Sequence, residues 1–130
     1  MVYLLVDPSE WFIKAEGFLE EAHDDLERGR YWLVCFHMQQ AVELYLKGFL
    51  VKTIGSYPFT HSLVELLESI ENLDYSVPEE IYTYAEALEK HYTRARYPGV
   101  GLTIYNKRVA ERCIFYGEKI IEFIKEILKE

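Results

Sequence analysis

The most apolar stretch of the chain lies at residues 30–53 and reads RYWLVCFHMQQAVELYLKGFLVKT. Its hydrophobic residues recur at steps of three and four, which is the period of an α-helix. The main stripe consists of Val34, Met38, Ala41, Tyr45 and Phe49. Further apolar residues widen this stripe, namely Cys35, Val42 and Leu46. An apolar arc this wide is typical of a helix that contacts several others, so we expect residues 30–53 to form the central helix of a helical domain.

Helical spacing of apolar residues continues on both sides of the central segment. The further segments begin near Pro8, Ser62, Ser76 and Ile104. Glycine and proline separate the segments, as in the loops at residues 55–61 and 96–101. Long helices joined by short loops favour an all-α fold, an up-and-down bundle of four main helices plus one short inserted helix. We expect a single domain that spans residues 1–130.

Three of these segments begin with a helix-capping pattern. Asp7 precedes Pro8, a residue that is favoured in the first turn of a helix. Ser62 and Ser76 are each followed three residues later by a glutamate, which is the spacing of a capping box. The sequence therefore predicts Asp7, Ser62 and Ser76 as N-terminal caps.

The composition excludes several classes of protein. Half of the 130 residues are hydrophobic and 15% are aromatic, which is enough for a packed core and unlike a disordered chain. The formal net charge of −8 argues against a protein that coats nucleic acid or an anionic membrane. Charges interrupt the longest apolar stretches, and the apolar run at residues 1–6 ends at Asp7, too soon for a signal peptide. We therefore expect no membrane span and a cytoplasmic location.

Two patterns bear on redox and metal chemistry. Cys35 and Cys113 lie far apart in the sequence and in apolar helical contexts, so we expect buried free thiols. The pair Glu20-x-x-His23 matches half of a carboxylate-bridged di-iron site, but such sites need the motif twice and this chain has it once. The sequence therefore predicts neither a metal site nor a cofactor.

Polar residues also follow one side of the central segment. His37, Gln40, Glu43 and Lys47 are spaced three, three and four residues apart, so they share a helix face. This stripe has two interpretations. It is either a solvated face that carries an ordinary Glu43–Lys47 pair, or a binding face.

The local charge reverses between residues 90 and 112. Six basic residues stand there against one acidic residue; they are Lys90, Arg94, Arg96, Lys107, Arg108 and Arg112. If the intervening loop turns the chain back, Arg94 and Arg96 approach Arg108 and Arg112, and such a patch suits phosphate. The interleaved Tyr92 and Tyr97 suit stacking on bases. Alternatively, the arginines neutralise a helix C-terminus and the tyrosines pack in the core.

Three elements of the sequence resemble the HEPN family (higher eukaryotes and prokaryotes nucleotide-binding domain). They are FHMQQAVELYLK at residues 36–47, THSL at residues 60–63 and YTRARYP at residues 92–98. The resemblance implies a bundle of four main helices that forms a homodimer. The positions it implies for the site are Gln40, Glu43, Lys47, His61, Arg96 and Tyr97. It also implies a minimal nucleotidyltransferase as partner, in a two-component, toxin–antitoxin-like system.

Other HEPN proteins are metal-independent RNases with an Arg-x(4–6)-His motif at a dimer cleft, and this sequence departs from that pattern. No histidine follows Arg94 or Arg96 at that spacing, and the formal match of Arg30 with His37 lies in the central helix. Three hypotheses remain open. The chain is a module that binds a nucleotide, RNA or the nucleotidyltransferase; an RNase that uses Arg94, Arg96 and His61; or a purely structural dimerisation domain.

Overall fold

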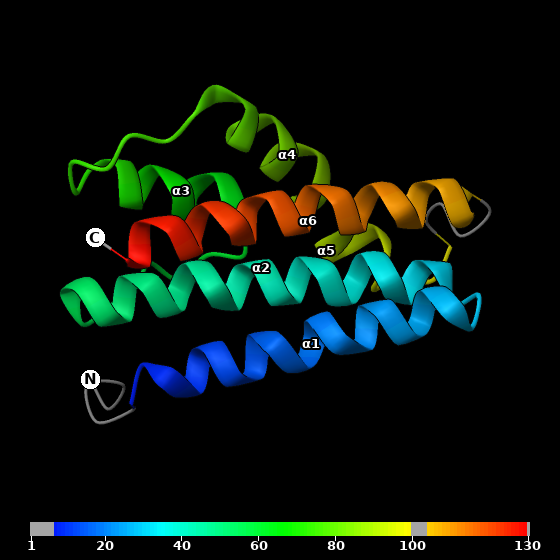
Figure 1. Ribbon diagram of the computed structural model, residues 1–130. Coiled ribbons are helices and arrows are strands. Elements are labelled where there is room, and N and C mark those ends of the chain that lie inside the picture. Colours follow the sequence, from blue (N-terminus) through cyan, green and yellow to red (C-terminus); the bar gives the residue numbers. More distant parts are fainter. Residues whose placement is uncertain (1–6, 100–103, 130) are drawn as a thin grey trace.

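The computed structural model describes residues 7–99 and 104–129, and every regular element in these ranges is a helix (Figure 1). The helices are α1 (Ser9–Glu27), α2 (Tyr31–Ile54), α3 (Leu63–Glu71), α4 (Glu79–Glu89), α5 (His91–Arg94) and α6 (Lys107–Leu128). The predicted all-α bundle is confirmed. The run at residues 1–6 and the part of the predicted loop at residues 100–101 lie outside the described residues.

Helix α2 occupies the centre of the bundle, as its wide apolar arc predicts. It packs against α1 on one side and α6 on the other (Figure 1), and α3 and α5 also contact it, while α4 packs mainly against α6 and α3. The interior is built from α2 side chains such as Met38, Leu46 and Phe49, together with Leu66 of α3 and Ile120 of α6. Most residues of α2 are buried, because this helix has neighbours almost all round.

The helix ends agree with the capping predictions at two of three places. The Asp7 carboxylate accepts a hydrogen bond from the Ser9 backbone N–H at 3.0 Å, and Ser62 Oγ accepts one from the Glu65 N–H at 3.2 Å. The prediction for Ser76 is wrong, because α4 begins three residues later, directly after Pro78, with no side-chain cap. The proline sets the start of this helix with its fixed backbone angle.

Two further boundaries differ from the sequence prediction. The fourth helical segment is interrupted at Lys90, and the chain continues as the single-turn helix α5. Helix α6 begins at Lys107 rather than near Ile104, because the Asn106 side chain accepts a hydrogen bond from the Val109 N–H at 2.9 Å and acts as the cap.

The prediction of free thiols is wrong. Cys35 of α2 and Cys113 of α6 form a disulfide, and their Cα atoms lie 5.3 Å apart. The reason is that each cysteine lies on the apolar face of its own helix, and these two faces meet in the core. The bond ties together two long helices whose cysteines are 78 residues apart in the sequence.

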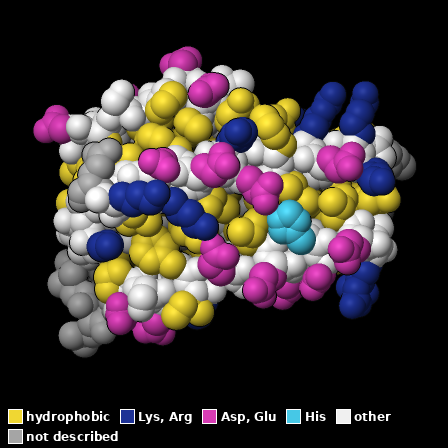
Figure 2. All heavy atoms as spheres, in the orientation of Figure 1, with side chains coloured by type: hydrophobic (Ala, Val, Ile, Leu, Met, Phe, Trp, Pro, Cys, Tyr) yellow, Lys and Arg dark blue, Asp and Glu magenta, His cyan; other side chains and the backbone are white. Residues whose placement is uncertain are grey.

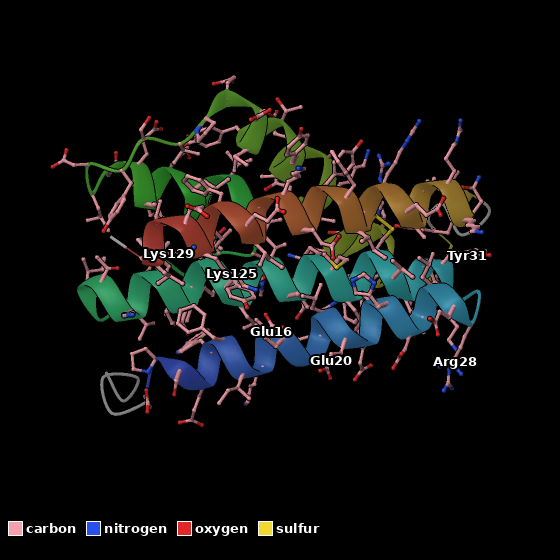
Figure 3. The ribbon with its side chains drawn as sticks, in the orientation of Figure 1. Glu16, Glu20, Arg28, Tyr31, Lys125 and Lys129 are labelled. Atoms are coloured by element: carbon pink, nitrogen blue, oxygen red, sulfur yellow. A yellow bond between two sulfur atoms is a disulfide. The ribbon has the colours of Figure 1, made fainter. Side chains whose placement is uncertain are left out.

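Ion pairs at the surface also connect the helices. Lys125 of α6 lies near Glu16 of α1 (Figure 3), with its Nζ 3.6 Å from a carboxylate oxygen. Acidic side chains are scattered over the face drawn in Figure 2, and several basic side chains gather at the end where α6 begins. No helix in the described part of the chain is long and apolar enough to span a membrane.

Candidate functional site

A buried carboxylate lies at the centre of the candidate site. Glu43 of α2 is only 5% exposed. Its Oε2 accepts a hydrogen bond from Lys47 Nζ at 2.8 Å, and its Oε1 accepts one from Gln39 Nε2 at 3.0 Å. His61, in the loop before α3, places Nδ1 3.0 Å from Oε2. We call Gln39, Glu43, Lys47 and His61 the Glu43 network.

The network keeps Glu43 charged inside the protein. Burial alone raises the pKa of a carboxyl group, because it disfavours the charged form. Hydrogen bonds from Lys47, Gln39 and His61, together with the positive charge of Lys47, outweigh that effect and hold the pKa of Glu43 below its ordinary value of 4.5. The ammonium group of Lys47 also lies over the ring of Tyr57, 5.1 Å from its centroid. Glu43 and Lys47 are therefore a buried, hydrogen-bonded ion pair, so the interpretation of them as an ordinary solvated pair is wrong.

A row of stacked planar groups leads from the Glu43 network to the surface. The His61 ring stacks on Tyr92 of α5, with centroids 4.0 Å apart. The Arg96 guanidinium lies 4.3 Å from the Tyr92 ring centroid and 5.4 Å from that of Phe36. Arg96 also donates a hydrogen bond to the Tyr92 hydroxyl at 3.3 Å. We call His61, Tyr92, Arg96 and Phe36 the stacked row.

A pocket of about 260 Å³ opens beside the stacked row. Its lining includes the aromatic rings of Trp32 and Tyr97 and the side chains of Arg94 and Arg96. Tyr97 is 55% exposed and Trp32 38%. This pocket therefore presents two rings and two cations to solvent, which suits a base and a phosphate.

A second pocket, of about 150 Å³, lies between α5 and α6. Lys90, Arg94 and Arg112 contribute to its lining. The predicted gathering of arginines thus occurs for Arg94 with Arg112, whereas Arg96 lies on Tyr92 and Phe36. Arg108 lines neither pocket.

The floor of the second pocket includes His91 of α5. His91 is buried, and its Nδ1 lies 2.5 Å from the Tyr105 hydroxyl. Burial, reinforced by the charges of Lys90 and Arg94, lowers the pKa of His91 to about 4. A buried and neutral imidazole is poorly placed to exchange protons with a substrate at the surface.

The polar stripe on α2 divides into two parts. Gln40 donates a hydrogen bond to Gln39 at 2.7 Å and so extends the Glu43 network. His37 turns towards α1 instead, where its Nδ1 lies 2.6 Å from a carboxylate oxygen of the buried Asp25. His37 therefore belongs to the α1–α2 contact. His23 is also engaged elsewhere, 3.0 Å from Glu118 of α6.

The site also contains three residues that were not predicted from the sequence, namely Gln39, Phe36 and Trp32. The sequence does indicate a special role for Gln39, because this polar residue lies inside the apolar arc of the central helix and four positions before Glu43. A fully buried amide at such a position needs partners, and Glu43 provides one. Phe36 and Trp32 carried no such signal, since apolar residues are common throughout this helix.

Known proteins resemble this chain both in sequence and in structure. A family model described as the HEPN domain matches residues 8–127. TT1696 from Thermus thermophilus has a similar structure, with a TM-score of 0.84 and 31% identity over 92% of this chain and 96% of that one. For an HEPN domain protein from Thermotoga maritima, tm0613, the TM-score is 0.76 and the identity 30% over 93% and 98% of the two chains. MJ1304 from Methanocaldococcus jannaschii, a candidate toxin, is 28% identical, and the match covers 89% of each chain.

Proposed function

Because the chain belongs to the HEPN domain family, we propose that it is a binding module for nucleotides or RNA that acts in a toxin–antitoxin-like two-component system. The observation that carries this proposal is the stacked row, which extends from the buried Glu43 network to the surface. His61, Tyr92 and Arg96 present planar faces and positive charge at one place.

The chemistry of the stacked row and the adjoining pocket suits nucleic-acid components. Bases stack on aromatic rings and on guanidinium planes, and each such contact is worth roughly 1–3 kcal/mol by alanine substitution. Arg94 and Arg96 supply donors for phosphate oxygens beside the exposed ring of Tyr97. Because the whole chain has a net charge of −8, favourable contacts with phosphate require a local group of basic residues such as this one.

The proposal includes a protein partner. The similarity to a candidate toxin supports a two-component role, and the family resemblance supports a minimal nucleotidyltransferase as the second component and a homodimer as the working form. Co-purification with a nucleotidyltransferase encoded beside this chain tests the partner. The complex is expected to weaken when Arg96 is replaced by alanine.

Fluorescence anisotropy with labelled single-stranded RNA and labelled nucleotides tests binding directly. We expect Arg96→Ala to weaken affinity at least fivefold, and Arg96→Lys to fall between wild type and Arg96→Ala because it keeps the charge and loses the planar group. Lys125→Ala is the matched control, since it removes one exposed positive charge near Glu16, away from the stacked row. Affinity should also fall as salt rises. Absence of binding to RNA, nucleotides and nucleotidyltransferase would refute the proposal.

The position of His61 favours a second function, metal-independent RNA cleavage. His61 is held by Glu43 at 3.0 Å and stacked on Tyr92, which in turn carries Arg96. A histidine and an arginine thus share one surface although the family motif is absent from its usual position in the sequence. In such a reaction the histidine shuttles a proton and the arginine stabilises the charge of the transition state, leaving a cyclic phosphate.

An RNA cleavage assay in EDTA separates these functions. Cleavage by wild type that disappears in both His61→Ala and Arg94→Ala/Arg96→Ala supports the RNase. Binding without cleavage supports the binding module. An intact dimer whose partner binding is unchanged by Arg96→Ala supports a purely structural dimerisation domain.

A further inference from the structure

Three potential metal ligands meet in the core, outside the stacked row. Cys35 of α2, His91 of α5 and Cys113 of α6 are all buried, and one ligand atom from each lies within 4.8 Å of the others. The two sulfurs are joined as a disulfide. The Glu43 network and the stacked row use none of these three residues.

We propose that, once the disulfide is reduced, Cys35, Cys113 and His91 bind a zinc-class divalent ion. Two thiolates and one imidazole are ligands that Zn²⁺ favours, and their two negative charges balance the charge of the ion. A disulfide has no thiolate to offer, so the oxidised protein does not bind the ion. The oxidation state of the cysteine pair thus decides whether the site exists.

The backbone geometry fits a metal site without rearrangement of the helices. Two sulfurs bound to the same tetrahedral zinc lie about 3.8 Å apart, given Zn–S bonds of about 2.3 Å. The Cα atoms of Cys35 and Cys113 are 5.3 Å apart, so rotation of the two side chains is sufficient to reach that separation. The Cα positions can remain those of the disulfide form.

His91 is held in a manner typical of metal ligands. The Tyr105 hydroxyl lies 2.5 Å from Nδ1, which leaves Nε2 as the nitrogen available to the ion. Ligating histidines commonly have such a partner on the other ring nitrogen, and it fixes the orientation of the ring. Tyr105 therefore serves as a positioning residue for His91.

The pocket between α5 and α6 provides access and a fourth coordination position. Both His91 and Cys113 line this pocket of about 150 Å³, which is large enough for a water molecule or a small anion. Lys90, Arg94 and Arg112 also line it. These cations stabilise thiolates after reduction, and they favour water or a small anion as the fourth ligand.

Reduction of the disulfide comes before metal binding. A dithiol reductant transfers two electrons and two protons to the disulfide, and is itself oxidised to a disulfide, which yields the Cys35 and Cys113 thiols. Binding of the divalent ion then displaces one proton from each thiol, so two protons leave for each ion bound. In the reverse direction a disulfide oxidant accepts two electrons from the two thiolates and two protons from solvent and becomes a dithiol, while the Cys35–Cys113 bond forms again and the ion is released.

Co²⁺ titration of the whole protein tests this site, because Co²⁺ bound to thiolates absorbs in the near ultraviolet whereas Zn²⁺ is spectroscopically silent. The reduced protein, freed of reductant and kept without oxygen, is expected to bind one Co²⁺ per chain with a thiolate charge-transfer band, and Zn²⁺ should displace it. The oxidised protein is expected to show no band. Absence of the band in reduced protein that retains its helical circular dichroism would overturn the proposal.

Variants assign the ligands. His91→Gln should weaken Co²⁺ binding at least tenfold, and Tyr105→Phe should weaken it roughly 10- to 100-fold, the usual range for loss of a partner to a ligating histidine. His23→Gln is the matched control, since His23 pairs with Glu118 away from the cluster. Unchanged affinity in His91→Gln, or a band that persists in Cys35→Ser/Cys113→Ser, would contradict this ligand set.

Discussion

At the scale of single residues, Glu43 is the side chain on which the site depends most. It is buried together with Lys47, and each neutralises the other. We expect Glu43→Gln to lower the free energy of unfolding by roughly 3 kcal/mol, because it leaves the Lys47 ammonium buried without its counter-charge. Urea denaturation measures this change. The double variant Glu43→Gln/Lys47→Met, which removes both charges, should be more stable than Glu43→Gln; equal or lower stability would contradict the argument.

The same pair predicts how stability depends on pH. The pKa of Glu43 in the folded chain lies below its ordinary value of 4.5. Its contribution to stability is therefore complete at pH values well above 4.5, and it is lost as the pH falls below that value towards the pKa of the folded state. The urea midpoint of wild type should fall more steeply over this range than that of Glu43→Gln/Lys47→Met. Parallel curves for the two proteins would show that Glu43 is not the group responsible.

Only part of this site can be predicted from the sequence. The spacing of Glu43 and Lys47 and the position of His61 mark them as candidates, because charged or titratable residues at regular intervals are visible in the sequence. Their burial is not visible there, since it depends on where the loop before α3 folds. The stack of His61 on Tyr92 likewise depends on the contact between two segments about 30 residues apart.

At the scale of elements, the close packing of α1 on α2 leaves no room for a side chain at Gly48. A Cβ added at Gly48 would lie 2.8 Å from the Cβ of Trp11 and 2.9 Å from a ring carbon of Phe12. We expect Gly48→Ala to destabilise the protein by about 1–3 kcal/mol, because the Cβ of Trp11 cannot move without shifting α1. Thermal unfolding followed by circular dichroism measures the effect.

Gly17 in α1 provides the control for that prediction. A Cβ at Gly17 meets no atom within 4 Å. Gly17→Ala should therefore stabilise the protein by about 0.5–1 kcal/mol, which is the gain in helix propensity alone. The two substitutions should change the stability in opposite directions. A gain in stability for Gly48→Ala would mean that α1 and α2 are less closely packed at this position.

The helices differ in how well the sequence predicts them. Long segments with regular apolar spacing, such as α2 and α6, are evident because many residues repeat the same signal. The single turn α5 is too short to have a period, so the sequence does not separate it from α4; in the structure it packs against α2. The disulfide was not predicted, because the spacing of residues within a helix does not show which residues of two helices meet. Spacing shows that Cys35 and Cys113 face inwards but gives no information on whether they face each other.

At the scale of the whole molecule, the disulfide constrains the bundle through the unfolded state. It closes a loop between cysteines that are 78 residues apart. The chain-entropy estimate for a loop of that length is roughly 4.5 kcal/mol. We therefore expect reduction to lower the free energy of unfolding by about this amount, as measured by urea denaturation with and without a dithiol reductant. Identical curves for oxidised and reduced protein would contradict this expectation.

Metal binding should offset part of that loss, because the proposed ion also ties α2 to α6 and adds α5 through His91. A ligand that binds only the folded state, present at about 100 times its dissociation constant, stabilises a protein by about 2.7 kcal/mol. We therefore expect Zn²⁺ to raise the melting temperature of the reduced protein and to leave that of the oxidised protein unchanged. In Cys35→Ser/Cys113→Ser the ion should have no effect. Stabilisation of the oxidised protein to the same extent would place the ion elsewhere, because the disulfide form has no thiolate to offer it.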